Sequence, residues 1–461
     1  MDGYYAWMLM ATSLVLLMTA PGLALFYGGM SRSKSVLNML MMSFSALGVV
    51  GMVYALWGFS MSYSSGIADA DGETGWEAAK LFDSPFQQFG LSNTDPTSYI
   101  TVAFQMTFAV ITAALISGAI ADRVKFSSWL VFMPIWVTLS YFPLAHQVWG
   151  GGFLSDVDGG LAALIFGTVG DAADKVAEVA PIDYAGGTVV HINAGVAGLV
   201  LALLIGRRKG FGKEPMKPHN LTLTMIGAGL LWFGWFGFNV GSIVLTGADE
   251  AENVAQFTTE TGLVWLNTTL ATCAAMMGWL LIERIRDGKG TSLGAASGVV
   301  AGLVAVTPAC GALSPIGSMV LGVAAGVLCA LAVGLKYRFG YDDSLDVVGV
   351  HLVGGLVGTI GIGFLATTGG LFYGDGIKQF VVQVTVAVYA VVWAGLATLI
   401  VGVAIKYTLG WRVTEDVEIE GIDFAEHGES AYDFAGNTGR RNVLGASEPA
   451  TKKHVEEGVK A

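Results

Sequence analysis

Two related stretches decide how this chain folds: residues 183–198, DYAGGTVVHINAGVAG, and residues 343–358, DSLDVVGVHLVGGLVG. In both, an acidic residue stands eight positions before a histidine, and glycines follow the histidine by four and seven positions. Each stretch opens a long apolar run, so His191 and His351 lie several residues inside a helix that rises about 1.5 Å per residue. The repeated pattern predicts two related halves, each with one buried histidine.

The composition around these stretches is that of a membrane protein. Of 461 residues, 54% are hydrophobic and 13% are charged, whereas soluble domains average about 25% charged residues. The 64 glycines and 12 tryptophans suit a helical membrane bundle, where small residues allow close helix packing and Trp lies at interfaces. A net charge of -12 argues against a nucleic acid partner. The N-terminus, MDGYYAWMLM, has no basic segment, which favours a spanning helix over a removable signal peptide.

Segments without Asp, Glu, Lys or Arg predict the membrane spans, because a spanning helix needs about 20 mostly apolar residues. They cover residues 3–31, 35–68, 96–121, 126–155, 184–206, 218–248, 261–282, 290–335, 347–374 and 379–405. The segment 290–335 is too long for one span, and Pro308 and Pro315 bracket a turn inside it. We therefore expect an all-α polytopic membrane protein with eleven transmembrane helices.

The basic residues orient these spans. If the N-terminus is outside and the C-terminus inside, all but three of the 24 Lys and Arg residues lie inside; the exceptions are Lys80, Lys175 and Lys378. This distribution satisfies the positive-inside rule. The same assignment puts half of the 36 acidic residues outside. A negative outer surface would gather cations near a pore mouth, although the same residues also suit an ordinary solvated loop surface.

The span count also interprets the two histidine stretches. They open spans five and ten, and because five is an odd number, the second copy must be inverted relative to the first. The expected architecture is a five-plus-five inverted repeat over about residues 3–206 and 218–374, with a final span at 379–405. Residues 1–405 then form the transmembrane domain. Residues 406–461 form a charged cytosolic tail, partly ordered against the inner face.

Buried histidines at matching positions indicate function more strongly than one alone. Intramembrane ionisable residues usually face a bundle interior or a cavity, although a single such histidine is more often a satisfied core residue. Facing imidazoles at His191 and His351 could share a proton and line a narrow path for a small neutral molecule. A metal centre is the alternative, but no Cys, Asp or Glu shares their depth as a third ligand. We expect no metal and no cofactor.

The three cysteines do not suggest a site. Cys273, Cys310 and Cys329 all lie in apolar runs, and no pair has metal-ligand spacing. We expect them to be buried small side chains without a disulfide.

Aromatic residues cluster on three of the predicted spans. Phe104 and Phe108 share a helix face at four-residue spacing, Trp149 ends span four at the outer interface, and span six reads LLWFGWFGFNVGS up to Ser242. Most transmembrane aromatics only pack or anchor. A small cation over such rings gains about 0.5–2 kcal/mol, however, and a neighbouring hydroxyl would favour an N–H donor over a bare alkali ion.

Several motifs together resemble the ammonium transporter family (Amt/Mep/Rh), specifically its microbial Amt branch. They are FQMTFAVITAALISGAIADR, YFPLAHQVWGGG, DYAGGTVVHINAGVAGLV, GFGKEPMKPHN, GWFGFNVGS, DDSLDVVGVH and, in the tail, GIDFAEHGESAY. The resemblance runs from the first span to the tail. It implies a homotrimer in the plasma membrane whose protomers each carry a pore.

The resemblance also implies roles for individual residues. Phe108, Trp149 and Ser242 would recruit ammonium at the outer side, and Asp183 would support that site without binding the ion. Asp183 also reads as a helix N-cap, and both roles can hold. Phe108 and Phe238 would form a stacked gate, with Phe104 nearby. His191 and His351 would line the pore, and Trp235 would form part of its wall.

In this family NH4+ is recruited and deprotonated, NH3 passes the histidines, and the proton follows separately. Bacterial members are often plugged from the cytosol by a PII-type signalling protein. The alternatives are an ammonium sensor of the same fold with little transport, and a membrane enzyme with a histidine-bound metal; we expect no enzyme. One departure from the family pattern is Leu352, where glycine commonly follows the second histidine, which puts the transport rate in doubt.

Overall fold

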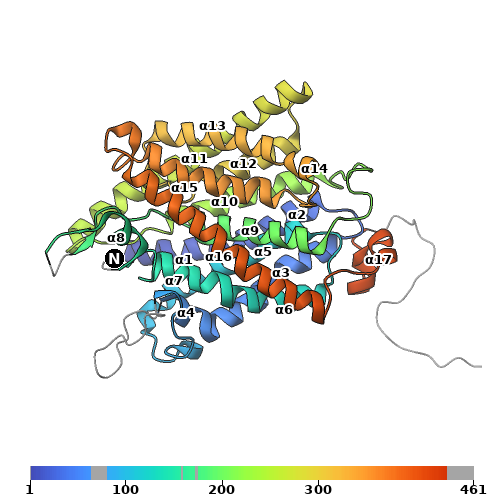
Figure 1. Ribbon diagram of the computed structural model, residues 1–461, viewed down its shortest axis with the longest axis horizontal. Coiled ribbons are helices and arrows are strands. Elements are labelled where there is room, and N and C mark those ends of the chain that lie inside the picture. The colour runs from blue at the N-terminus through green and yellow to red at the C-terminus, as the bar shows by residue number, and fades with distance from the viewer. Residues whose placement is uncertain (1, 64–79, 157–158, 172–174, 433–461) are drawn as a thin grey trace, which may run out of the picture.

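The computed structural model describes residues 2–63, 80–156, 159–171 and 175–432, and in this part of the chain it is almost entirely helical. The long helices run side by side across Figure 1. Ten are long and apolar enough to cross a membrane: Asp2–Met30, Val36–Tyr63, Pro96–Ile120, Phe126–Trp149, Gly187–Ile205, Leu221–Val240, Glu250–Asp287, Pro315–Phe339, Val348–Leu365 and Lys378–Thr408. An eleventh apolar helix, Ser292–Val306, is shorter.

Several of these long helices are an α-helix joined end to end with a short stretch of tighter 3-10 or wider π-helix, labelled η. In chain order the elements are α1 (Asp2–Leu17), η1 (Met18–Leu23), α2 (Ala24–Met30), α3 (Val36–Val53), η2 (Tyr54–Gly58), α4 (Phe59–Tyr63), η4 (Phe89–Leu91), η5 (Pro96–Ser98), α5 (Tyr99–Ile120), α6 (Phe126–Trp136), η6 (Val137–Tyr141), α7 (Phe142–Trp149), α8 (Leu161–Phe166), β1 (Thr168–Val169), β2 (Val176–Ala177), η7 (Gly187–Ile192), α9 (Asn193–Ile205), α10 (Leu221–Val240), α11 (Glu250–Asp287), α12 (Ser292–Val306), α13 (Pro315–Ala332), α14 (Leu335–Phe339), η8 (Val348–Leu352), α15 (Val353–Leu365), η9 (Leu371–Tyr373), α16 (Lys378–Thr408), α17 (Glu415–Glu420) and η10 (Asp423–His427).

The segment 290–335 divides into two helices as predicted. The turn between α12 and α13 contains Pro308, and Pro315 is the first residue of α13. The Ser314 hydroxyl accepts a hydrogen bond from the Gly317 N–H at 3.1 Å and so caps α13. Proline suits this first position because it has no N–H to leave unpaired.

Glycines explain how closely α11 and α13 pack. A Cβ atom at Gly322 would lie 2.2 Å from the Ala271 carbonyl oxygen, and one at Gly326 would lie 2.1 Å from the Ala275 oxygen. Both distances are far below any real contact, so only glycine allows this approach. This is the small-residue packing expected between membrane helices.

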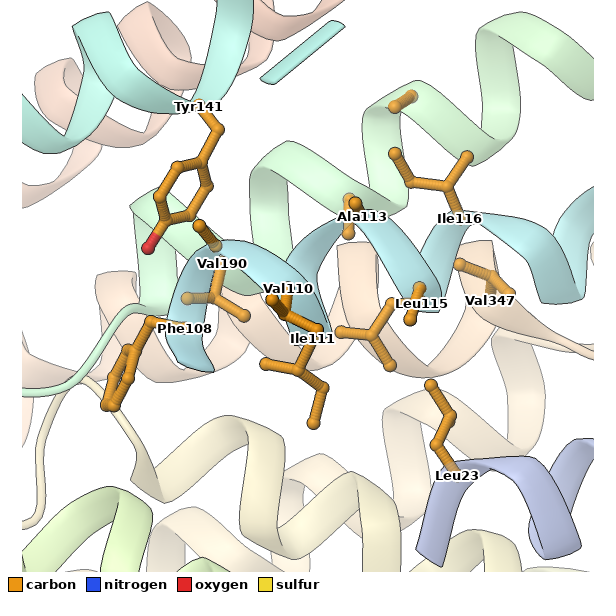
Figure 2. Packing of buried hydrophobic residues seen from close by; sticks show 14 of the residues in the cluster. Leu23, Phe108, Val110, Ile111, Ala113, Leu115, Ile116, Tyr141, Val190 and Val347 are labelled. Atoms are coloured by element: carbon orange, nitrogen blue, oxygen red, sulfur yellow. The ribbon is translucent and has the colours of Figure 1, made fainter. Parts of the chain in front are cut away.

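One helix, α5, contributes much of the core. Phe108, Ile111 and Leu115 project from it at three- and four-residue spacing, and all three are buried. Figure 2 shows them between Tyr141, Val190 and Leu23, which come from three other segments. A helix buried on nearly all sides lies at the centre of the bundle.

We name the two ends of the bundle by residues. The Trp149 end holds α8, the β1–β2 hairpin and the N-terminus, and the Arg208 end holds α14 and α17 (Figure 1). The hairpin pairs Thr168 with Ala177 and Val169 with Val176 in antiparallel register.

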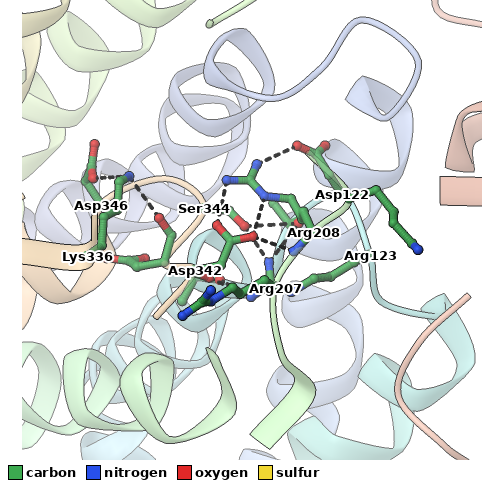
Figure 3. A network of polar contacts seen from close by, with 12 residues as sticks. Asp122, Arg123, Arg207, Arg208, Lys336, Asp342, Ser344 and Asp346 are labelled. Atoms are coloured by element: carbon green, nitrogen blue, oxygen red, sulfur yellow. Dashed lines mark hydrogen bonds and ion pairs between the residues drawn. The ribbon is translucent and has the colours of Figure 1, made fainter. Parts of the chain in front are cut away.

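A buried ion cluster at the Arg208 end was not foreseen from the sequence. The Arg208 guanidinium donates to both carboxylate oxygens of Asp342, at 2.8 and 2.9 Å, and to Asp122 at 3.0 Å. Arg123 donates to the Asp342 carbonyl oxygen at 2.6 Å and to Ser344. Figure 3 shows these side chains converging from the ends of α5 and α9 and from the segment before η8.

The charges in this cluster set the pKa values of its members. Burial lowers the pKa of Arg123 to about 10, against the opposing charge of Asp342. Burial alone would lower the pKa of Arg208, but hydrogen bonds to Asp342 and the charge of Asp122 outweigh this effect and raise it. Burial opposes ionisation of Asp342, yet Arg208 lowers the pKa of this carboxyl. Each group is therefore ionised and paired at neutral pH.

The tail is ordered against the Arg208 end up to Tyr432, and residues 433–461 lie outside the described residues. The Asp423 carboxylate accepts hydrogen bonds from the Leu37 and Asn38 N–H groups, at 3.1 and 2.8 Å, and so caps α3. Glu426 accepts from the Phe126 N–H at 3.0 Å at the start of α6. One tail segment thus caps two helices.

Substitution Asp423→Ala should release this contact. Losing an N-cap costs about 0.5–2 kcal/mol, so the amides of residues 37 and 38 should exchange hydrogen faster while the rest of α3 stays protected. Hydrogen exchange followed by mass spectrometry measures this. Asp416→Ala, at an exposed acidic residue of α17, is the control. Unchanged exchange at residues 37 and 38 would contradict the capping role.

The prediction of three buried cysteines was wrong for one of them. Cys310 and Cys329 are buried, but Cys273 is exposed. It lies four residues before Met277 and eight before Leu281, which are also exposed, so this face of α11 is not covered by the described part of the chain.

Candidate functional site

The site begins with a loop shaped by Asp183. One carboxylate oxygen accepts hydrogen bonds from the Gly186 and Gly187 N–H groups, at 2.8 and 2.6 Å, and the other accepts from the Thr188 N–H at 2.9 Å and from its hydroxyl. Gly186 has a φ of +116°, a backbone conformation that glycine adopts without strain. Asp183 therefore caps the first turn through its side chain, although the residue at the N-cap position itself is Gly186. This cap places the turn that carries His191.

The second histidine stretch is built in the same way. The Asp343 carboxylate accepts from the Val347 and Val348 N–H groups, at 3.1 and 2.8 Å. Burial raises the pKa of Asp343 to about 6, and the neighbouring Lys336 charge opposes this rise. Both histidines lie in π-type turns, η7 and η8, which widen the helix at that point. Such turns often occur at functional sites, and the sequence alone did not predict them.

The two histidines face each other in the centre of the bundle. Their Nδ1 atoms are 3.3 Å apart, their ring centroids are 5.4 Å apart, and both side chains are buried. Because two bare nitrogens would repel, one Nδ1 carries a hydrogen and donates it to the other. The His191 Nε2 atom has no hydrogen-bond partner among the described residues, so it is free to bind a small molecule.

Aromatic rings separate the histidines from the Trp149 end. The Phe108 and Phe238 rings stack with centroids 4.0 Å apart at 10°, and Phe104 lies 4.8 Å from Phe108. The Trp149 ring meets Phe108 edge-on at 6.2 Å on one side of the stack, and His191 lies 6.2 Å from Phe238. Phe104, Phe108 and Phe238 are buried, so the stack closes the path.

Two partly exposed residues flank the stack at the Trp149 end. The Trp149 indole N–H donates to the Asp183 carbonyl oxygen at 2.9 Å, which fixes the ring beside the Asp183 loop. The Ser242 hydroxyl donates to the Phe238 carbonyl oxygen at 2.8 Å and keeps lone pairs for a donor. No hydrogen bond joins Ser242 to Trp149 in the described part of the chain.

Below the stack lies an enclosed, almost wholly apolar cavity. The space open to the centre of a water-sized molecule is about 10 Å³, roughly what a single water requires. Its lining includes residues from seven helical elements: Met18, Leu23, Phe26, Ile111, Leu115, Val190, His191, Leu231, Trp235, Phe238, Val300 and His351. Among these, only the histidines and Trp235 carry polar atoms in their side chains.

Trp235 is held by a polar chain that sequence reasoning missed. Its ring stacks on His191 at 5.5 Å, and its indole N–H donates to the Thr307 hydroxyl at 2.8 Å. Asn239 lies 3.3 Å from that hydroxyl and donates to Thr268 at 3.0 Å. Polar residues within apolar runs were the available signal, but their partners are far away in sequence.

Leu352 does not narrow the cavity. It is absent from the lining residues, and its backbone packs against Gly195, where a Cβ atom would lie 2.4 Å from the Leu352 nitrogen. Its main contact is therefore between α9 and η8, and its effect is on helix packing.

No group of three or more His, Cys, Asp or Glu side chains in the described residues could hold a metal ion.

Comparison with known proteins gives consistent results. The sequence model of the Ammonium Transporter Family matches residues 6–432. An ammonium transporter from Mycobacterium tuberculosis (strain ATCC 25618 / H37Rv) is 49% identical over 459 residues, covering 94% of this chain and 91% of that protein. Among solved structures, Candida albicans Mep2 has a TM-score of 0.74 at 28% identity, covering 94% of this chain and 90% of that one. A protein described as a sensor Amt protein has a TM-score of 0.77 at 26% identity, covering 92% and 98%.

Proposed function

Because this chain belongs to the ammonium transporter family, we propose that it carries ammonium across a membrane along the path from Trp149 to His351. The observation that carries this proposal is the order of groups on one line. The Trp149 ring, whose face can attract a cation, comes first, then the stacked Phe108 and Phe238 rings, and then an apolar cavity with two facing histidines. Such an order selects a molecule that is charged outside and neutral inside.

Recruitment of NH4+ takes place at Trp149, Phe108 and Ser242. The ring faces attract the cation, and the Ser242 oxygen accepts one of its N–H groups. Asp183 supports this site from behind, because its oxygens are already occupied by the backbone of its own loop. Its role is to hold the Trp149 ring through its carbonyl oxygen.

Passage beyond the stacked rings requires loss of a proton. With ring centroids 4.0 Å apart, Phe108 and Phe238 leave no room between them, so a ring must rotate for each molecule that passes. A cation would lose its hydration in the apolar cavity at a cost of several kcal/mol, whereas NH3 pays little. We therefore place deprotonation of NH4+ at the outer side of the gate, where solvent water at the partly exposed Trp149 end accepts the proton.

The histidine pair then offers NH3 both kinds of hydrogen-bonding group. The imidazole whose Nδ1 donates has a bare Nε2, which accepts an N–H of ammonia. The other imidazole carries its hydrogen on Nε2 and donates to the ammonia lone pair. Trp235, held by Thr307, keeps the His191 ring in place. The proton crosses separately in this proposal, so that transport moves net charge.

The proposed membrane architecture has eleven spans, the ten long helices and the shorter α12. The Trp149 end is outside and the Arg208 end is inside, as the distribution of Lys and Arg favours. The matching Asp caps before His191 and His351, and the π-type turns that contain these histidines, support a five-plus-five inverted repeat. Residues 1–405 form the transport domain and 406–461 the cytosolic tail.

We further propose a homotrimer in the plasma membrane, with a PII-type signalling protein docking on the inner loops and tail. The family supports this part of the proposal. The relatives are described as transporters and not as enzymes, which is consistent with a protein without catalytic activity. A sensor with little transport is the second candidate function, since a protein described as a sensor shares this fold.

Current recording on proteoliposomes tests the proposal. An ammonium pulse should give a transient current that grows with protein density, and methylammonium uptake should accompany it. A potassium pulse and protein-free liposomes are the controls. Absence of both current and uptake would contradict transport, and saturable ammonium binding without flux would favour the sensor.

A further inference from the structure

The outer turns of α11 hold the segment that carries Ser242. The Gln256 amide nitrogen donates to the Val244 carbonyl oxygen at 3.0 Å, and its amide oxygen accepts from the Thr246 N–H at 2.9 Å. Asn253 makes a similar pair with Gly247, at 2.9 and 3.3 Å. The backbone two to five residues after Ser242 is therefore fixed by side chains of another helix.

The same turns hold the Asp183 loop from the other side. The Tyr184 hydroxyl donates to one oxygen of Glu260 at 2.7 Å, and Gln256 donates to the other oxygen at 3.0 Å. Burial raises the pKa of Tyr184, so its phenol remains protonated and able to donate. A Cβ atom at Gly311 would lie 2.6 Å from the Tyr184 ring, so the ring has a closely fitted position. Tyr184, Glu260 and Gln256 thus connect the two loops of the recruitment site.

Glu260 also brings a negative charge that has no cationic partner in the described part of the chain. It is half-buried, both its oxygens accept from neutral donors, and no Lys or Arg among the described residues forms an ion pair with it. A half-buried carboxylate is less screened by salt than an exposed one. Glu260 therefore contributes a negative potential beside Asp183 that salt weakens only in part.

We propose that Gln256 and Glu260 are positioning residues for the recruitment site, and that the Glu260 carboxylate also raises the affinity of that site for ammonium. Glu260 would act on Trp149 through Tyr184 and the Asp183 carbonyl oxygen, and Gln256 would act on Ser242 through the following backbone. This inference rests on the proposed function, because it concerns the affinity of the same site.

Four variants in proteoliposomes separate the charge from the hydrogen bonds. Glu260→Gln keeps an acceptor and loses the charge, so half-saturation should rise about threefold at low salt, with the same maximal current and a smaller difference at high salt. Glu260→Ala also loses the anchor, so half-saturation should rise about tenfold. In the double variant Tyr184→Phe/Glu260→Ala, the second substitution should raise half-saturation by less than it does alone, because the two residues act as one unit.

Glu250→Gln is the matched control, since it removes one negative charge from the first residue of the same helix, ten residues before Glu260. Its half-saturation should stay within about twofold of the unchanged protein, and elution in detergent should show that every variant is folded. Equal half-saturation in all variants of a conducting protein would overturn this inference alone. An unchanged protein without current would overturn the proposed function and this inference with it.

Discussion

Proteoliposomes with the double substitution His191→Asp and His351→Asp are expected to lose the preference for ammonium over potassium. The Nδ1 atoms are 3.3 Å apart in an enclosed apolar cavity, so two carboxylates would stand almost in contact there. The two carboxylates would share one proton, so that the pair carries one negative charge. A buried negative charge favours cations and water over neutral ammonia. The preference should fall at least about tenfold, which corresponds to about 1.4 kcal/mol.

Paired currents from ammonium and potassium pulses measure this ratio in one preparation. His219→Asn is the control, because it replaces a histidine that contacts Ser31 and Tyr432 at the Arg208 end, outside the cavity lining. That variant should keep the ratio of the unchanged protein. A double Asp variant that still excludes potassium would remove the two histidines from the conduction path.

The helical bundle could be predicted because the central part of each long helix appears in the sequence as a run without charged residues. The helix Glu250–Asp287 extends beyond its uncharged run 261–282 at both ends, into residues expected to be loop. The division of 290–335 followed from two prolines: α12 ends at Val306, shortly before Pro308, and α13 begins at Pro315. The predicted burial of His191 and His351 is also confirmed. These features depend on local sequence, where hydrophobicity and proline act directly.

Features that depend on distant pairs could not be predicted. Arg208 was counted only as one positive charge of an inner loop, whereas its carboxylate partners lie 86 and 134 residues away and all three side chains are buried. Glu260 was likewise counted as a loop acid, although it bonds to Tyr184, 76 residues earlier. The widened turns at the two histidines could not be predicted, because both lie in runs that are apolar on every face, where the extra residue of a π-type turn breaks no visible pattern. Cys273 was misplaced because an apolar run does not reveal which of its faces is covered.

Substitution Arg208→Met is expected to destabilise the protein by about 3–5 kcal/mol, the usual effect of removing one partner of a buried ion pair. Asp342 is fully buried and would lose the two hydrogen bonds from the Arg208 guanidinium, keeping only the one from the backbone N–H of that residue. Asp122 would lose its ion pair. Methionine fills the volume of the arginine stem but carries no charge, so Arg123 would be the remaining nearby cation for both carboxylates. Thermal unfolding in detergent, followed by Trp fluorescence, should show a clearly lower midpoint.

The pH dependence of this loss separates unpaired charge from lost packing. In the unchanged protein, Arg208 lowers the pKa of Asp342, so the stability from this pair is complete above the ordinary pKa and is lost only in acid. Without Arg208, burial acts on Asp342 with less opposition, its pKa rises, and protonation should recover stability as the pH falls. The midpoint difference between the variant and the unchanged protein should therefore be smaller at pH 5 than at pH 7.5.

Arg207→Met is the matched control for this measurement. Arg207 stands next to Arg208 but is exposed, and its side chain donates to the Gly340 carbonyl oxygen and lies over the Phe211 ring. Its loss should change stability by roughly 0.5 kcal/mol or less, with no dependence on pH. If both variants lost the same stability at both pH values, the cluster at Arg208 would be packing alone. A pH-dependent loss confined to Arg208→Met is the result expected if its charge holds the ends of α5 and α9 to the segment before η8.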